Sequence, residues 1–210
     1  MFIDFGAGFY VEKHLKRYQK LDPNEIVIGI DATTEIPERF SEFLQIMDDY
    51  YIKEKDTYIK KKETPFKYFD KYFFGTGIQD ELKLESKADH WICISTLEHV
   101  REQDIFSVME GIVNKVKETS VGSILIDLTD HLKYPPDEKN CFYHYKDPLY
   151  RSEWNPTNVA TWNNGHRGIF LNRVRREEWF IILDQFFTYD LGPTDGVTTI
   201  DILNVKIKKC

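Results

Sequence analysis

Two acidic residues and two glycines near the start of the chain have a spacing that suits nucleotide binding. The apolar run at residues 1–5 contains Asp4 and leads into Gly6 and Gly8. Glycine tolerates positive φ and lets the backbone approach a ligand closely. Asp31 follows a second apolar run and lies 25 residues after Gly6. Its carboxylate could accept hydrogen bonds from both hydroxyls of a ribose, so these residues predict a nucleotide site.

The elements that must position these residues are a strand, a helix and a second strand. Residues 1–5 and 26–30 are short apolar runs of the kind that form buried strands, and residues 11–20 between them have a helical pattern. Strand, glycine turn, helix, strand and acid is the layout of a nucleotide-binding βαβ unit.

The same alternation of apolar runs and helical periods continues along the chain and predicts a mostly parallel sheet with helices on both faces. A final strand, turn and strand predict an antiparallel hairpin at the C-terminus. The expected helices are 37–51, 104–119 and 175–187, and the expected strands are 72–74, 91–95, 123–128, 186–189 and 199–207.

Three polar residues follow the expected strand at 123–128. An aspartate or histidine there could take the proton from an attacking hydroxyl or amine, which makes Asp127, Asp130 and His131 candidate catalytic residues. The alternative is that Asp130 caps a turn and His131 is merely exposed. Oxygen ligands at this place would also suit Mg²⁺, but no metal site is predicted.

Glu98 and His99 follow the expected strand at 91–95, where ligands bind in open α/β sheets. They are candidate substrate-binding residues, although an acid in the first turn of a helix is also favoured by the helix dipole alone. Asp80 could follow a third strand and contact an adenine amino group, or it could be an ordinary turn residue.

The bulk composition limits the classes of protein. A chain of 210 residues is long enough for one domain, so we expect a single domain over 1–210 with an irregular insertion at about 129–168. The net charge of −7 disfavours nucleic acid and anionic lipid. No apolar run is long enough to span a membrane.

Three cysteines without close spacing predict a reducing, cytoplasmic location and no zinc site. The aromatic content of 15 % suits a pocket or a homodimer contact.

Three segments of the chain resemble class I S-adenosylmethionine-dependent methyltransferases. These are the glycine turn at 3–8, the acid-ended segment 29–31 and the Leu-Glu-His-Val run within 94–100. The resemblance implies a Rossmann-like fold with a seven-stranded sheet and an antiparallel C-terminal hairpin. It also implies S-adenosylmethionine as cofactor and methyl transfer to an oxygen or nitrogen of a small molecule or glycan. The cofactor-binding residues would be Asp4, Gly6, Ala7, Gly8, Asp31, Asp80, Ser95 and Leu97.

A narrower likeness concerns the segments 127–131 and 172–175. They are similar to uncharacterised methyltransferases often found with polysaccharide-modifying genes, and some of these also have an aromatic residue where Phe9 stands. Asn172 and Arg173 match this pattern, and Arg173 could bind an acidic substrate group or pair with a core carboxylate.

Two departures from the family pattern keep other functions open. Tyr10 stands where the motif usually has a third glycine, and the chain begins at the first strand without the usual preceding segment that covers the cofactor. A ring that blocked the site would leave a catalytically inactive methyltransferase-like binding or assembly protein. A nicotinamide dehydrogenase would share the glycine turn and Asp31, but the Leu-Glu-His-Val run and the terminal hairpin disfavour it.

Overall fold

The computed structural model describes residues 1–34, 36, 38–61, 63–128, 172, 174–193 and 199–208. The predicted insertion at about 129–168 lies outside the described residues, as do Asp130, His131 and Arg173.

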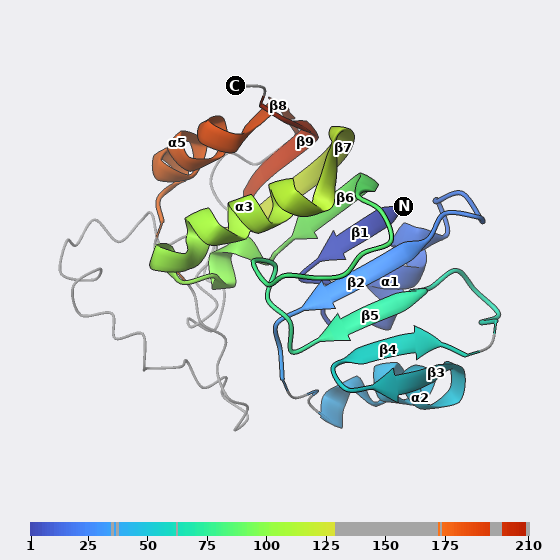
Figure 1. Ribbon diagram of the computed structural model, residues 1–210. Helices are drawn as coiled ribbons and strands as arrows, with labels where there is room; N and C mark the ends of the chain where they lie inside the picture. The colour runs from blue at the N-terminus through green and yellow to red at the C-terminus, as the bar shows by residue number, and fades with distance from the viewer. Residues whose placement is uncertain are drawn as a thin grey trace. The chain divides into compact units, whose positions relative to one another are not determined.

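The chain forms a mostly parallel α/β sheet, as predicted, with antiparallel strands at its C-terminus (Figure 1). The sheet has nine described strands rather than the expected seven, paired in the order β3-β4-β5-β2-β1-β6-β7-β9-β8. The strands are β1 (Phe2–Phe5), β2 (Val27–Asp31), β3 (Tyr51–Glu54), β4 (Thr57–Lys60), β5 (Lys71–Phe74), β6 (Ala88–Ile94), β7 (Val116–Asp127), β8 (Phe187–Leu191) and β9 (Thr199–Ile207). The helices are α1 (Val11–Tyr18), α2 (Ser41–Tyr50), α3 (Ile105–Lys115) and α5 (Arg176–Phe186), with short 3₁₀ turns η1 (Glu38–Phe40), η2 (Leu97–His99) and η3 (Glu102–Asp104).

Two compact units can be distinguished along the chain. The first consists of residues 1–92 and 110–121, and the second of residues 93–109 and 122–210. Strands β6 and β7 each contribute residues to both units.

In the first unit, β2 pairs in parallel with β1 on one side and β5 on the other. Phe5 is in register with Ile30, and Asp31 with Phe74. The carboxyl ends of β1 and β2 therefore lie at the same edge, which brings the glycine turn and Asp31 together as the βαβ prediction requires.

Aromatic side chains dominate the core of the first unit. Helices α1 and α2 bury their apolar positions against rings from β5 and from the segment before it, and Figure 1 shows α1 behind β1 and β2. Gly29 in the middle of β2 leaves room for these rings, since a Cβ there would lie 2.5 Å from Tyr72 and 2.7 Å from Phe69. The high aromatic content is thus largely core packing in this unit.

The hairpin of β3 and β4 is an element that the sequence pattern did not predict. Its strands pair antiparallel with each other, and β4 also pairs antiparallel with β5. The connecting turn places Lys55 at φ 54°. Most side chains of this edge hairpin are partly or fully exposed, so the alternation that identifies a half-buried strand is missing.

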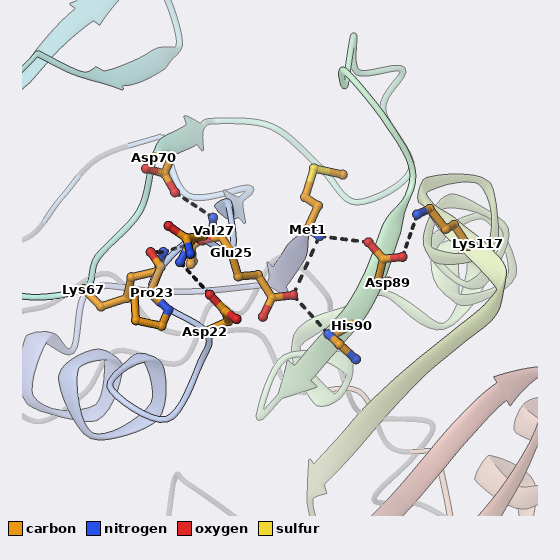
Figure 2. Close-up of polar contacts among 11 residues, drawn as sticks. Met1, Asp22, Pro23, Glu25, Val27, Lys67, Asp70, Asp89, His90 and Lys117 are labelled. Carbon is orange, nitrogen blue, oxygen red and sulfur yellow. Dashed lines mark hydrogen bonds and ion pairs between the residues drawn. The ribbon is translucent and has the colours of Figure 1, made fainter.

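Polar contacts fix the chain where it enters β2 (Figure 2). The Nζ of Lys67 donates hydrogen bonds to the carbonyl oxygens of Pro23 and Glu25, and the N–H of Val27 donates to Oδ2 of Asp70 at 2.8 Å. These contacts lie at the amino end of β2, opposite the end that carries Asp31.

The second unit contains the predicted C-terminal hairpin. Strand β9 pairs antiparallel with β8 and with β7. The predicted helix at 104–119 was wrong at its end, because α3 ends at Lys115 and β7 begins at Val116. The strand expected at 123–128 therefore begins earlier, at Val116. Burial alternates over much of 116–127, which is the period of a strand.

Candidate functional site

The turn after β1 adopts the backbone conformation that its glycines permit. Gly6 has φ 69° and Gly8 has φ 64°, values that disfavour any residue with a Cβ. The N–H groups of Gly6 and Ala7 both donate to the carbonyl oxygen of Ile30, at 2.8 and 3.1 Å. Among the described residues, the nearest neighbour of a Cβ on Gly8 would be the Gly6 carbonyl oxygen, 4.0 Å away, so the described part of the chain leaves open space beside this residue.

Asp31 meets the glycine turn directly. Its Oδ2 accepts the N–H of Gly8 at 2.8 Å, and its Oδ1 accepts the N–H of Thr33 at 2.8 Å. The residue is 8 % exposed. Each carboxylate oxygen has two lone-pair directions, so each can accept a further hydrogen bond while keeping its backbone contact. A pair of adjacent hydroxyls is a suitable donor for this arrangement.

Asp4, predicted to bind the cofactor, lies in an internal ion-pair network. It is 1 % exposed, and its Oδ2 accepts hydrogen bonds from Arg17 Nη1 at 2.5 Å and from the Tyr18 hydroxyl at 2.6 Å. Both partners come from α1. This geometry joins β1 to the helix that follows the glycine turn, and it favours a structural role for Asp4.

Tyr10 does not fill the space between Gly8 and Asp31. Its side chain is 51 % exposed, and its ring meets Phe40 edge-on at 5.1 Å with the ammonium of Lys13 above it at 4.4 Å. The missing third glycine therefore leaves the contact between the turn and Asp31 intact.

Two residues that were not predicted as site residues hold the turn from the core side. His14 on α1 lies with its Nε2 2.7 Å from the carbonyl oxygen of Ala7, and the Tyr72 hydroxyl donates to the carbonyl oxygen of Gly8 at 3.3 Å. His14 is 1 % exposed. The sequence indicated the position of His14 only through its helical spacing from the apolar residues Val11 and Tyr18.

Asp80, the candidate adenine contact, is exposed and follows β5 in the same unit. Its Oδ2 accepts the N–H of Gly77 at 2.6 Å. The buried Nζ of Lys115 donates to the carbonyl oxygens of Ile78 and Asp80, both at 2.7 Å. Burial lowers the pKa of Lys115. The helix end thus fixes the backbone that presents Asp80.

In the second unit, the residues after β6 form a tight turn. Ser95 has φ 50°, which is uncommon for a residue with a Cβ, and its N–H donates to the carbonyl oxygen of Leu125 at 2.8 Å. Leu97 is fully buried, so only its backbone is suited to a polar ligand. Glu98 and His99 complete the turn η2, with His99 Nε2 3.9 Å from Glu98 Oε1.

Glu98 is a buried acid whose carboxyl oxygens have no hydrogen-bond partner among the described residues. Its side chain is 3 % exposed. Burial raises the pKa of Glu98 well above its usual range, and the nearby negative charge of Asp127 raises it further. The dipoles of the nearby backbone amides of Glu98 and Asp127 oppose part of this rise. The structure therefore brings two predicted site residues, Glu98 and Asp127, into electrostatic contact.

Asn172 fixes this turn, and its function was not predicted beyond a match to the narrower pattern. Its Nδ2 donates to the carbonyl oxygens of Leu97 and Val100 at 2.7 and 2.8 Å. Its N–H donates to the carbonyl oxygen of Glu98 at 2.7 Å. A single buried amide thus holds both ends of the turn that carries Glu98 and His99.

The remaining candidates are only partly placed. Asp127 is the last residue of β7, whereas Asp130, His131 and Arg173 lie outside the described residues. Over the part of the chain that the structure describes, no group of three His, Cys, Asp or Glu residues could hold a metal ion. In the same part, no helix is long and apolar enough to cross a membrane.

A polar hollow of about 450 Å³ lies at the amino end of β2, away from Asp31. Its cations are already paired, because Lys60 contacts Asp70 at 2.7 Å and Lys67 donates to backbone carbonyls. We therefore do not assign the candidate site to this hollow.

No protein-family model matches the chain, and no curated protein matches its sequence. Solved structures do match its fold. The PH0226 protein from Pyrococcus horikoshii OT3 is 12 % identical with a TM-score of 0.56, over 99 % of this chain and 81 % of that protein. An S-adenosylmethionine-dependent methyltransferase from Clostridium acetobutylicum ATCC 824 is 12 % identical with a TM-score of 0.53, over 99 % of this chain and 84 % of the enzyme.

LepI in complex with S-adenosylhomocysteine and a substrate analogue is 10 % identical with a TM-score of 0.53. That match covers 99 % of this chain but only 43 % of LepI, so the chain spans less than half the length of LepI. Identities this low show the fold alone. The chain has a Rossmann-like fold that S-adenosylmethionine-dependent methyltransferases of known structure also have.

Proposed function

We propose that the chain is an S-adenosylmethionine-dependent methyltransferase acting on an oxygen or nitrogen of a small molecule or glycan. The observation that carries this proposal is the contact between Gly8 and the carboxylate of Asp31. It joins the two halves of a nucleotide-binding βαβ unit at the end of the strands where ligands bind in open α/β sheets.

The residues of the first unit fit an adenosine-containing cofactor. Asp31 would accept the ribose hydroxyls, and the open space beside Gly8 would admit the methionine part next to Gly6 and Ala7. Asp80, on its fixed turn, would contact the adenine. In the second unit, Ser95 and Leu97 remain predicted cofactor-binding residues, through their backbone.

When bound, S-adenosylmethionine supplies a methyl group on a sulfonium, which is a good leaving group, so the protein must mainly align the acceptor and remove one proton. Asp127, Asp130 and His131 are the proposed proton acceptors. Glu98, whose pKa is raised by burial, is the proposed hydrogen-bond donor to the acceptor. His99 and Arg173 would complete the acceptor site.

Calorimetric titration with S-adenosylhomocysteine tests this function. Asp31→Ala should raise the Kd about 5- to 150-fold, because it removes ribose contacts worth about 1–3 kcal/mol. Asp22→Ala is a matched control, since Asp22 also accepts the N–H of the residue two positions on, at 2.8 Å, but lies away from the glycine turn. No heat at millimolar ligand with folded wild-type protein would refute the proposal.

A binding protein without methyl transfer is the second candidate. A structure described as a pericyclic reaction enzyme has the same fold, with a TM-score of 0.53, so this fold also serves other chemistry. Cofactor binding without turnover on a broad panel of acceptors would favour this candidate, and turnover would exclude it. Under either function we expect a cytoplasmic protein and a homodimer formed through exposed aromatic residues.

A further inference from the structure

The peptide bond between Ala7 and Gly8 is held at both ends. Its carbonyl oxygen lies 2.7 Å from His14 Nε2, and its N–H donates to Asp31 Oδ2 at 2.8 Å. In a trans peptide the C=O and N–H point in opposite directions. Two contacts on opposite sides therefore fix the orientation of this peptide plane, which borders the open space beside Gly8.

The contacts of His14 determine which ring nitrogen carries the hydrogen. A carbonyl oxygen can only accept, so Nε2 must be the donor to Ala7. The Nδ1 atom lies 2.9 Å from the Tyr68 hydroxyl, which can donate to it when the ring is neutral. The ring stacks on Tyr18 at 5.5 Å and meets Phe69 edge-on at 5.1 Å. Every polar atom of the imidazole is thus engaged inside an aromatic core.

Burial and the neighbouring charged groups have opposing effects on the pKa of the His14 ring. Burial lowers the pKa of His14, and Arg17 lowers it further, whereas the carboxylates of Asp4 and Asp31 act in the opposite direction. The Asp4 carboxylate is itself paired with Arg17 and Tyr18. A neutral ring with its hydrogen on Nε2 suits the observed geometry, because the Tyr68 hydroxyl can then donate to Nδ1.

We infer that His14 is a positioning residue for the glycine turn. Its contact with the Ala7 carbonyl oxygen and the contact of Asp31 with the Gly8 N–H together fix the orientation of the peptide plane, and the methionine part of the cofactor binds against this plane. It acts from beneath the turn and does not touch the cofactor. The identity of the cofactor in this inference rests on the proposed function, whereas the contacts of His14 do not depend on it. The experiments below test the two separately.

The first test compares three variants by titration with S-adenosylhomocysteine. His14→Phe keeps a ring in the core but removes the donor to Ala7, so the Kd should rise about tenfold. His14→Gln supplies an amide that can both donate and accept, and it should recover most of that loss. Tyr51→Phe is the matched control, because the Tyr51 hydroxyl donates to the carbonyl oxygen of Phe69 at 2.6 Å in the same core. Like His14→Phe, Tyr51→Phe removes a side-chain hydrogen bond to a backbone carbonyl, yet it should leave the Kd unchanged.

The second readout needs no cofactor. Amide hydrogen exchange of Gly8 should become faster in His14→Phe and stay near wild type in His14→Gln and Tyr51→Phe, all compared under conditions where each variant is folded. Unchanged Gly8 exchange in His14→Phe would overturn the inference, and so would equal losses of affinity in His14→Phe and Tyr51→Phe. If the wild type binds no cofactor, the proposed function fails, while the exchange result still decides the role of His14.

Discussion

At the scale of single residues, the chemistry of the chain depends on what surrounds each carboxylate. Asp31 is buried, and each of its carboxylate oxygens accepts a backbone N–H. Among the described residues, the buried carboxyl oxygens of Glu98 accept no hydrogen bond, and burial and the charge of Asp127 raise its pKa. We therefore propose different roles for the two acids: Asp31 accepts hydrogen bonds, and Glu98 donates one.

The raised pKa of Glu98 predicts how pH affects stability. The folded state holds the proton more tightly than the unfolded state, so the free energy of unfolding should fall as pH rises above the unfolded pKa of about 4.5. One such group contributes a slope of at most about 1.4 kcal/mol per pH unit. Glu98→Gln should remove this slope in denaturant titrations above about pH 4.5.

Glu110→Gln, at an exposed position of α3, is the control for this prediction and should keep the wild-type slope. An equal slope in wild type and Glu98→Gln would show that Glu98 ionises normally in the folded protein. In that case its proposed role as a hydrogen-bond donor at neutral pH would be wrong.

At the scale of elements, close backbone packing fixes the segment that presents Asp80. Gly111 on α3 lies against this segment, and a Cβ there would lie 2.4 Å from the carbonyl oxygen of Ile78 and 2.8 Å from the Cα of Gln79. The Nζ of Lys115 then donates to two carbonyls of the same segment. The glycine is needed for space, not for an unusual φ.

Gly111→Ala should therefore lower the free energy of unfolding by about 1–3 kcal/mol, since overpacking against backbone outweighs the better helix propensity of alanine. Asn114→Ala, at an exposed position of the same helix, should be neutral or slightly stabilising. Chemical denaturation measures both. A stabilising effect of Gly111→Ala would mean that α3 does not pack this closely on Ile78.

The elements that could be predicted from the sequence are those with a clear period. The βαβ unit, α5 and the terminal hairpin appear close to the expected residues. The β3–β4 hairpin was not predicted because its two strands bury few side chains. The end of α3 was missed because Val113 and Val116 continue the helical spacing into the strand that begins at Val116.

Within the site, Gly8 and Asp31 could be predicted to converge because strand ends and turn chemistry are local properties. The functions of His14 and Asn172 could not, since each depends on a carbonyl that only the folded backbone brings near, Ala7 in one case and Leu97 in the other. Asp4 was predicted as a ligand from its place in a motif, yet its partners come from the next helix.

At the scale of the whole molecule, a sheet of nine strands supports two sets of candidate residues. The glycine turn, Asp31 and Asp80 belong to the first unit, and Glu98, His99 and Asp127 belong to the second. The fold is shared with an S-adenosylmethionine-dependent methyltransferase at 12 % identity, so function must be argued from these residues and not from the fold.

A crystal structure of the chain with S-adenosylhomocysteine tests the central claim most directly. The account predicts that both ribose hydroxyls lie within hydrogen-bond distance, about 2.6–3.2 Å, of the Asp31 carboxylate, with the Gly8 N–H still bonded to Oδ2. Ligand bound elsewhere would contradict it. So would crystals that remain free of ligand at millimolar concentration although the crystal packing leaves Asp31 and the glycine turn accessible to the ligand.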